Sequence, residues 1–161
     1  MPASRLSEPK GQLMLYFEDI EIGSLRTSGP YLVTRDEIVE FAKKYDPQPR
    51  HIDEDAAAHS VAGGLTAAGS HTFAIYTALT HGFQPPMHTL VALGWDELRL
   101  PNPVRPGDEL DLTSTILEKR ESNSNPTRGI VRFQIRLRNQ KRETVLQCIS
   151  NILVAKRPAA N

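Results

Sequence analysis

The segment from residue 70 to residue 81 constrains the fold of this chain most. Its pattern predicts a helix, and apolar side chains occupy nearly every side of it: Phe73, Ile75, Tyr76, Ala78 and Leu79. A helix that is apolar nearly all round is buried. Gly82 is suited to end this helix. The chain must therefore wrap its other elements around one central helix.

The part of the chain that follows this helix is predicted to form four strands. Phe133, Ile135 and Leu137 alternate with polar side chains, as in a strand with one buried and one wet face. Residues 105–108 read Arg-Pro-Gly-Asp, a type II turn signal. No helical crossover separates the strands, which excludes a doubly wound parallel sheet. We predict an α+β fold with an antiparallel sheet on one side of the central helix, and we expect a homodimer to cover the rest.

Ahead of the central helix, the sequence predicts one strand and two short helices. The strand spans residues 25–33. Thr34 and Glu37 have the spacing of a capping box that opens a helix, and Pro47 is expected to stop it. Asp53 is expected to cap a short helix over residues 56–58. The residues between these two helices are expected to form a loop.

Composition places the chain among single-domain globular proteins. It has 161 residues, and 19 basic side chains balance 19 acidic ones, which argues against a nucleic-acid partner. No apolar run approaches the roughly 18 residues of a membrane span, and the first residues lack the apolar core of a signal peptide. With the single Cys148, these features lead us to expect a cytoplasmic protein. We predict tails over residues 1–14 and 156–161, and one domain over residues 15–155.

The loop between the two predicted short helices carries the first candidate for chemistry. Asp46 and His51 stand five residues apart, and two prolines stiffen the backbone between them. A carboxylate beside an imidazole is a general acid and base pair that can hold one water and move its protons. The alternative is that Asp46 caps a turn and His51 packs against the helix.

The second candidate is the glycine-containing entry to the central helix, residues 63–70. The first N–H groups of a helix lack intrahelical partners and lie at the positive end of its dipole. Gly69 there allows a carbonyl oxygen to approach the backbone closely, as an oxyanion hole for a thioester requires. The alternative is that Gly69 only relieves crowding where the helix begins.

Taken together, these residues resemble the MaoC-like dehydratases, which include the R-specific enoyl-CoA hydratases. That family carries Asp-x-Asn-Pro-x-His followed eighteen residues later by a glycine at the central helix. Here Asp46, Pro49, His51 and Gly69 match this spacing. Further similarities lie at Phe17-Glu18-Asp19 and at residues 103–108, so the resemblance covers about residues 15–155. It implies a hot-dog fold, an antiparallel sheet wrapped around a long helix, which is usually dimeric.

The resemblance also implies a reaction, the addition of water to a trans-2-enoyl thioester, or its reverse. Asp46 would act as the base while water adds to C3, and His51 would help deliver a proton to C2. The Gly69 N–H would stabilise the thioester oxygen. The acyl carrier would be coenzyme A, as part of the substrate, and no metal or other cofactor is expected. Acyl-CoA lyase chemistry of this kind belongs to fatty acid metabolism.

Further residues are expected to contact the substrate. They are Gln48, Gly64, Ser70, His71 and Thr77. For His71 and Thr77, packing in the core is the alternative. Gln48 replaces the family's asparagine, and Ala68 replaces the histidine often seen before the glycine. With these two changes, the resemblance does not specify the acyl group of the substrate.

Two other functions stay open at this point. A hot-dog thioesterase would direct water at the thioester carbonyl and release free thiol. A non-catalytic acyl-thioester-binding subunit would bind the ligand without turnover. Our leading prediction is a hydratase or dehydratase that forms a homodimer or a higher assembly of dimers and binds neither nucleic acid nor membranes.

Overall fold

A computed structural model describes residues 13–159 of the chain, so residues 1–12 and 160–161 of the two predicted tails lie outside the described residues. In chain order the elements are the 3-10 helix Phe17–Asp19, β1 Leu25–Leu32, α1 Arg35–Tyr45, α2 Pro49–Ile52, α3 Glu54–Ala58, α4 Gly69–Thr80, β2 Thr89–Arg99, β3 Glu109–Glu121, β4 Arg128–Arg138 and β5 Thr144–Ala155. No helix in this part of the chain has the length and apolar character needed to cross a membrane.

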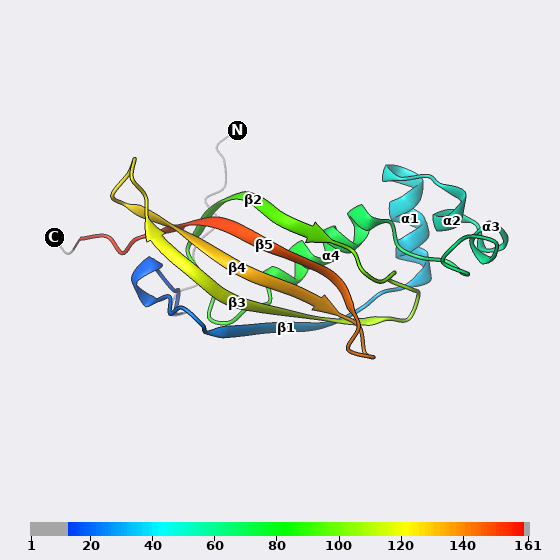
Figure 1. The fold of residues 1–161 in the computed structure, drawn as a ribbon, viewed down its shortest axis with the longest axis horizontal. Coiled ribbons are helices and arrows are strands. Elements are labelled where there is room, and N and C mark those ends of the chain that lie inside the picture. Colours follow the sequence, from blue (N-terminus) through cyan, green and yellow to red (C-terminus); the bar gives the residue numbers. More distant parts are fainter. Residues whose placement is uncertain (1–12, 160–161) are drawn as a thin grey trace, which may run out of the picture.

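The five strands form one antiparallel sheet in the order β1-β3-β4-β5-β2. Helix α4 runs along one face of this sheet, and α1, α2 and α3 gather at one end, beyond the start of α4 (Figure 1). The predicted α+β fold with an antiparallel sheet around a central helix is therefore confirmed. The observed α4 begins one residue before the predicted helix and ends one residue before its predicted end.

The core lies between the sheet and α4. Buried and less buried side chains alternate along β4, as the sequence pattern predicts, and Val131, Phe133, Ile135 and Leu137 point inward. Ile75, Tyr76 and Leu79 of α4 are buried with them. Part of the helix surface stays open, since Ala74, Thr77 and Ala78 are exposed.

Local signals set the ends of the short helices. Thr34 and Glu37 form the predicted capping box at the start of α1, and the Asp53 carboxylate accepts from the Ala56 N–H at 2.8 Å to cap α3. One local prediction is wrong, because residues 49–52 form the short helix α2 rather than loop. Pro49 occupies its first turn, where the fixed φ of proline suits a helix and no N–H is needed.

Strand β2 forms an unusual edge of the sheet. Within residues 13–159 it pairs with β5 alone, and ten of its eleven residues are exposed. Several of the exposed residues are large and apolar: Leu90, Val91, Leu93, Trp95 and Leu98. An exposed apolar edge strand is a template for pairing with another chain.

The two ends of the described chain meet at the opposite end of the sheet from α1. Arg157 Nη2 lies 2.7 Å from the Asp19 carboxylate, and Lys156 Nζ lies 2.6 Å from Glu121 Oε1. The residues that follow β5 are thus held against the 3-10 helix and the end of β3.

Candidate active site

Asp46 is presented by the end of α1. It is the C-cap residue of this helix, and its N–H donates to the Ala42 carbonyl at 2.9 Å. The Gln48 side-chain amide donates to Asp46 Oδ1 at 2.8 Å. The carboxylate is partly buried, with 30% of the side chain exposed. One carboxylate oxygen is therefore held by Gln48, and the other, Oδ2, is directed toward His51.

His51 is held in a defined orientation on α2. The residue is buried, and its Nδ1 lies 2.7 Å from the Thr66 carbonyl oxygen. Because a carbonyl only accepts, Nδ1 must carry the proton and donate. The neutral ring then has its lone pair on Nε2, where the Arg50 Nε donates at 3.3 Å. His51 thus presents a proton-accepting nitrogen to the site.

Asp46 and His51 face each other across a short gap. Asp46 Oδ2 and His51 Nε2 are 3.8 Å apart, which is too long for a direct hydrogen bond. A water molecule can contact both atoms across a gap of this length. The arrangement can therefore hold a water between two groups that each accept a proton.

The N-terminus of α4 is linked to this pair through the chain. Thr66, whose carbonyl holds His51, lies three residues before Gly69, the first residue of α4. The preceding Ala68 has no side-chain oxygen to cap the helix. Within the first turn, the His71 N–H donates to the Ala68 carbonyl at 2.9 Å, whereas the Gly69 and Ser70 N–H groups have no intrahelical acceptor and remain available to a bound oxygen atom.

The structure places the remaining predicted site residues in different surroundings. Ser70 is exposed at the start of α4. Gly64 lies beside Arg105, whose Nη1 would be 3.3 Å from a Cβ added there. Thr77 lies two turns along α4, where its hydroxyl donates to the Phe73 carbonyl at 3.0 Å. Of the predicted substrate contacts, only Gln48 meets the Asp46–His51 pair directly.

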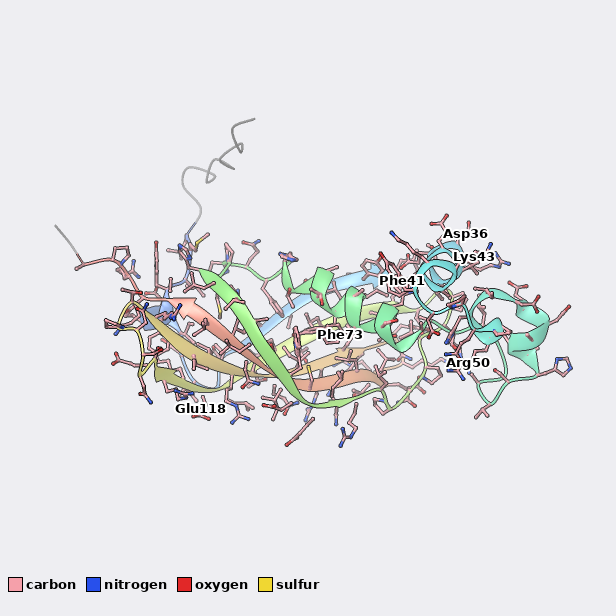
Figure 2. The ribbon with its side chains drawn as sticks, turned by 90° about the horizontal axis from the view of Figure 1, so that it is seen from above. Asp36, Phe41, Lys43, Arg50, Phe73 and Glu118 are labelled. Carbon is pink, nitrogen blue, oxygen red and sulfur yellow. The ribbon has the colours of Figure 1, made fainter. Side chains whose placement is uncertain are left out.

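His71 is turned toward α1 rather than toward Asp46 and His51. Its ring is buried, stacks on Phe41 with centroids 4.5 Å apart, and brings Nε2 to 3.2 Å from Glu37 Oε1. Figure 2 shows Phe41 where α1 and α4 meet. Burial lowers the pKa of His71, although the Glu37 carboxylate acts in the opposite direction. The position of the His71 ring therefore agrees with the alternative that this side chain packs in the core.

A cavity of about 400 Å³ lies between α4 and the inner face of the sheet. Its wall includes Thr77 and Thr80 of α4, Trp95 of β2 and Phe133 of β4. Trp95 Nε1 donates to the Tyr76 hydroxyl at 3.2 Å, and Phe73 packs edge-on against Trp95. The volume is within the range of ligand pockets, roughly 300–1,000 Å³. The cavity begins about two turns after Gly69 and continues toward the end of α4.

Sequence reasoning missed several residues of the site. Arg50 and the Thr66 carbonyl contact His51, and Arg26 lines the cavity, but no local pattern singles out any of the three. Glu37 carried a signal only for helix capping. Among residues 13–159, no three His, Cys, Asp or Glu side chains lie together as a metal site would require.

The model of the MaoC-like domain matches residues 20–135 of the chain. The chain belongs to the MaoC-like family. It is 40% identical to the MaoC-like dehydratase from Rhodospirillum rubrum, with a TM-score of 0.85 over 90% of this chain and 99% of that one. This MaoC-like chain also shares its fold with Rv0216 from Mycobacterium tuberculosis, which has a double hot-dog fold. The TM-score of this match is 0.75 at 14% sequence identity, and the match covers 92% of this chain and 46% of Rv0216.

Two curated relatives also match this MaoC-like protein. It is 27% identical to the uncharacterized protein YdeM of Bacillus subtilis, over 86% of this chain and 98% of that one. It is 31% identical to mesaconyl-CoA hydratase of Cereibacter sphaeroides, over 90% of this chain but only 42% of the hydratase. The predicted family and the hot-dog fold are therefore confirmed, and the protein is a member of a hydratase and dehydratase family.

Proposed function

We propose that this MaoC-like protein adds water across the double bond of a trans-2-enoyl thioester, with coenzyme A as the carrier, or catalyses the reverse dehydration. The observation that carries the proposal is the 3.8 Å gap between Asp46 Oδ2 and His51 Nε2, each fixed from behind by a hydrogen bond. Groups held in this way need little reorganisation during proton transfer. Membership of a hydratase and dehydratase family supports the same reaction.

The reaction begins with a water held between the two side chains. The water donates one hydrogen bond to Asp46 Oδ2 and the other to His51 Nε2, where it takes the place of the Arg50 Nε–H. Asp46 takes a proton as the water oxygen bonds to C3, and the C2–C3 double bond becomes single. Since His51 Nε2 starts without a proton, a proton that it passes to C2 must first come from the water or Asp46. The products balance as one hydroxyl on C3 and one hydrogen on C2.

The helix α4 is proposed to bind the rest of the thioester. Negative charge develops on the thioester oxygen as water adds, and the Gly69 N–H is placed to donate to it at the positive end of the helix dipole. The acyl chain then extends along α4 into the cavity of about 400 Å³ lined by Thr77. Catalysis of this kind uses the chain's own groups, and no cofactor is proposed.

We also propose that the protein is a homodimer built on β2. This edge strand carries the apolar side chains of Leu90, Val91 and Leu93, each about half exposed. Pairing two copies along β2 would satisfy its free backbone groups and cover these side chains. Light scattering behind size exclusion should give twice the chain mass, and Leu93→Lys should shift it toward the monomer.

The reaction is tested with purified protein, crotonyl-CoA and longer trans-2-enoyl-CoAs. Loss of the conjugated-thioester absorbance without release of free thiol is expected. Asp46→Asn and His51→Gln should each lower kcat by about 100-fold or more, the usual scale of general acid–base catalysis. Asp55→Asn, at an exposed carboxylate on α3, is the matched control and should leave kcat unchanged. Release of free thiol would replace the proposal with a thioesterase, and binding without turnover would replace it with a binding subunit.

A further inference from the structure

The cavity between α4 and the sheet contains one permanent charge, on Arg26 of β1. Among the described residues that line the cavity there is no aspartate, glutamate or lysine. The rest of the wall is apolar or carries hydroxyl groups, apart from His81. A guanidinium in such a wall is the feature that most distinguishes this cavity from a simple apolar pocket.

Arg26 is held in place but is not neutralised. Its guanidinium lies over the Phe83 ring at 4.9 Å from the centroid, and Nη2 donates to the Pro85 carbonyl. No ion pair joins Arg26 to a carboxylate within residues 13–159. The residue is partly buried, and this burial lowers the pKa of its guanidinium. A partly buried cation without a counter-charge is unfavourable, and a carboxylate ligand would relieve that cost.

Arg26 lies at the end of the cavity that is remote from Gly69. Its neighbours Phe83 and Pro85 follow the C-terminal end of α4, and Ser28, also on β1, packs against Gly82. The helix rises about 12 Å from Gly69 to Thr77 and about 16 Å to Thr80. A thioester held at Gly69 would therefore bring the far end of a medium-length acyl chain toward Arg26, rather than its reacting carbons.

We propose that Arg26 binds a carboxylate at the far end of the acyl chain. This inference rests on the proposed function and narrows it: the substrates are thioesters of dicarboxylic enoic acids, with one carboxyl group as the thioester and the other free. The guanidinium has five N–H donors in a planar fork that suits a carboxylate, and one of its nitrogens is directed to Pro85. The apolar wall between Thr77 and Arg26 would contact the methylene groups.

The test compares two series of trans-2-enoyl-CoAs of six to fourteen carbons, ending in a methyl group or in a carboxylate. At the favoured length, wild type should show a kcat/KM at least about tenfold higher for the carboxylate-ended member, as a charge-assisted pair provides. Arg26→Gln keeps a donor for the Pro85 carbonyl but removes the charge. It should abolish the preference by raising KM for the carboxylate series, with kcat and the methyl series little changed. Arg120→Met, at an exposed arginine on β3, is the control and should keep the preference.

A second measurement separates this inference from the proposed reaction. Calorimetry with the saturated acyl-CoAs of both series reports binding without turnover, and Arg26 should again favour the carboxylate end by about tenfold. If no enoyl thioester reacts but this difference holds, the reaction is wrong and the Arg26 site stands. If enoyl thioesters react and wild type favours methyl ends, or Arg26→Gln keeps the carboxylate preference, the Arg26 site is wrong. Absence of any binding also overturns it. If Arg26→Gln does not fold by circular dichroism, Arg26→Met is used for the same comparison.

Discussion

The imidazole of His71 in α4 is paired with the carboxylate of Glu37 in α1, with Nε2 and Oε1 3.2 Å apart. The Tyr31 hydroxyl donates to the same oxygen at 3.0 Å. Helix α1 ends at Tyr45 and is followed by its C-cap Asp46, and α4 begins at Gly69, two residues before His71. This pair therefore connects the helix that presents the proposed base to the helix that presents the proposed oxyanion donor.

The first prediction concerns that connection. Glu37→Ala removes the partner of His71 and half of the capping box at Thr34. It should lower the free energy of unfolding by about 1–3 kcal/mol, since a buried donor loses its acceptor and the helix loses a cap. Urea unfolding measures the change. Glu40→Ala, at an exposed residue of the same helix, should change it by less than about 0.5 kcal/mol. Equal effects of the two substitutions would contradict the prediction.

The second prediction is a pH dependence of stability that comes from His71. Burial lowers its pKa in the folded protein below the ordinary value of 6.5. As pH falls through about 6.5, the unfolded chain takes up a proton that the folded chain takes up only at lower pH. This residue therefore makes the folded state less stable as pH falls, by up to about 1.4 kcal/mol per pH unit, until the folded His71 is also protonated.

Urea unfolding of wild type and His71→Gln between pH 5 and pH 8 measures the contribution of His71 to the pH dependence of stability. Glutamine removes the titration, so the difference in unfolding free energy should shift in favour of His71→Gln as pH falls. His59→Gln, at an exposed histidine, serves as the control. A pH-independent difference between wild type and His71→Gln would show that burial does not depress this pKa.

The third prediction concerns Gln48, which holds one oxygen of Asp46 at 2.8 Å. Gln48→Leu removes the donor at similar volume and frees the carboxylate to rotate. A hydrogen bond to a charged group contributes about 1.5–3 kcal/mol, so kcat of the proposed hydration should fall about 10–100-fold. Steady-state kinetics with an enoyl-CoA measures it, and Gln48→Glu would be worse because it places a second carboxylate beside Asp46. Unchanged kcat in Gln48→Leu would mean that Asp46 is positioned without this amide.

The fourth prediction separates catalysis from packing at Gly69. A Cβ added there would meet Leu100 Cδ1 at 2.8 Å, and Leu100 is a half-exposed, flexible side chain that can move away. Gly69→Ala should therefore cost less than about 1 kcal/mol of stability. The new methyl group lies beside the N–H from which the proposed thioester oxygen would accept, so kcat should fall at least about tenfold. Thermal unfolding and kinetics together test this, and a large loss of stability would favour the crowding alternative for Gly69.

The fifth prediction concerns Cys148, which is 1% exposed in β5. Burial raises the pKa of its thiol to about 11, from an ordinary value of 9.0. At pH 8 the reactive thiolate is then about 100-fold rarer in the folded protein than in the unfolded chain. Alkylation by iodoacetamide, followed by mass spectrometry, should be at least that much slower in buffer than in urea. Fast labelling of the folded protein would show that β5 opens locally.

Much of this molecule follows from local patterns in the sequence. The all-round apolar helix requires burial, and alternation in β4 assigns the inward face of its strand, because both depend on neighbours only a few residues apart. The spacing of Asp46 and His51, with two prolines between them, made these residues candidates for a pair, and the structure brings the two side chains to 3.8 Å from each other. The same local reasoning failed at α2, where Pro49 starts a short helix instead of continuing the predicted loop.

Tertiary structure decided what each of these groups touches. The partner of His71 lies 34 positions earlier at Glu37, and the carbonyl that orients His51 lies 15 positions later at Thr66. Arg26 reaches the cavity wall only because β1 pairs with β3 and the loop at Phe83 and Pro85 folds back over it. Such contacts join segments far apart in the chain, so no local period or spacing encodes them. Periodicity determined which elements form and which faces are buried, whereas tertiary packing determined the tautomer and orientation of His51, the partner of His71 and the surroundings of Arg26.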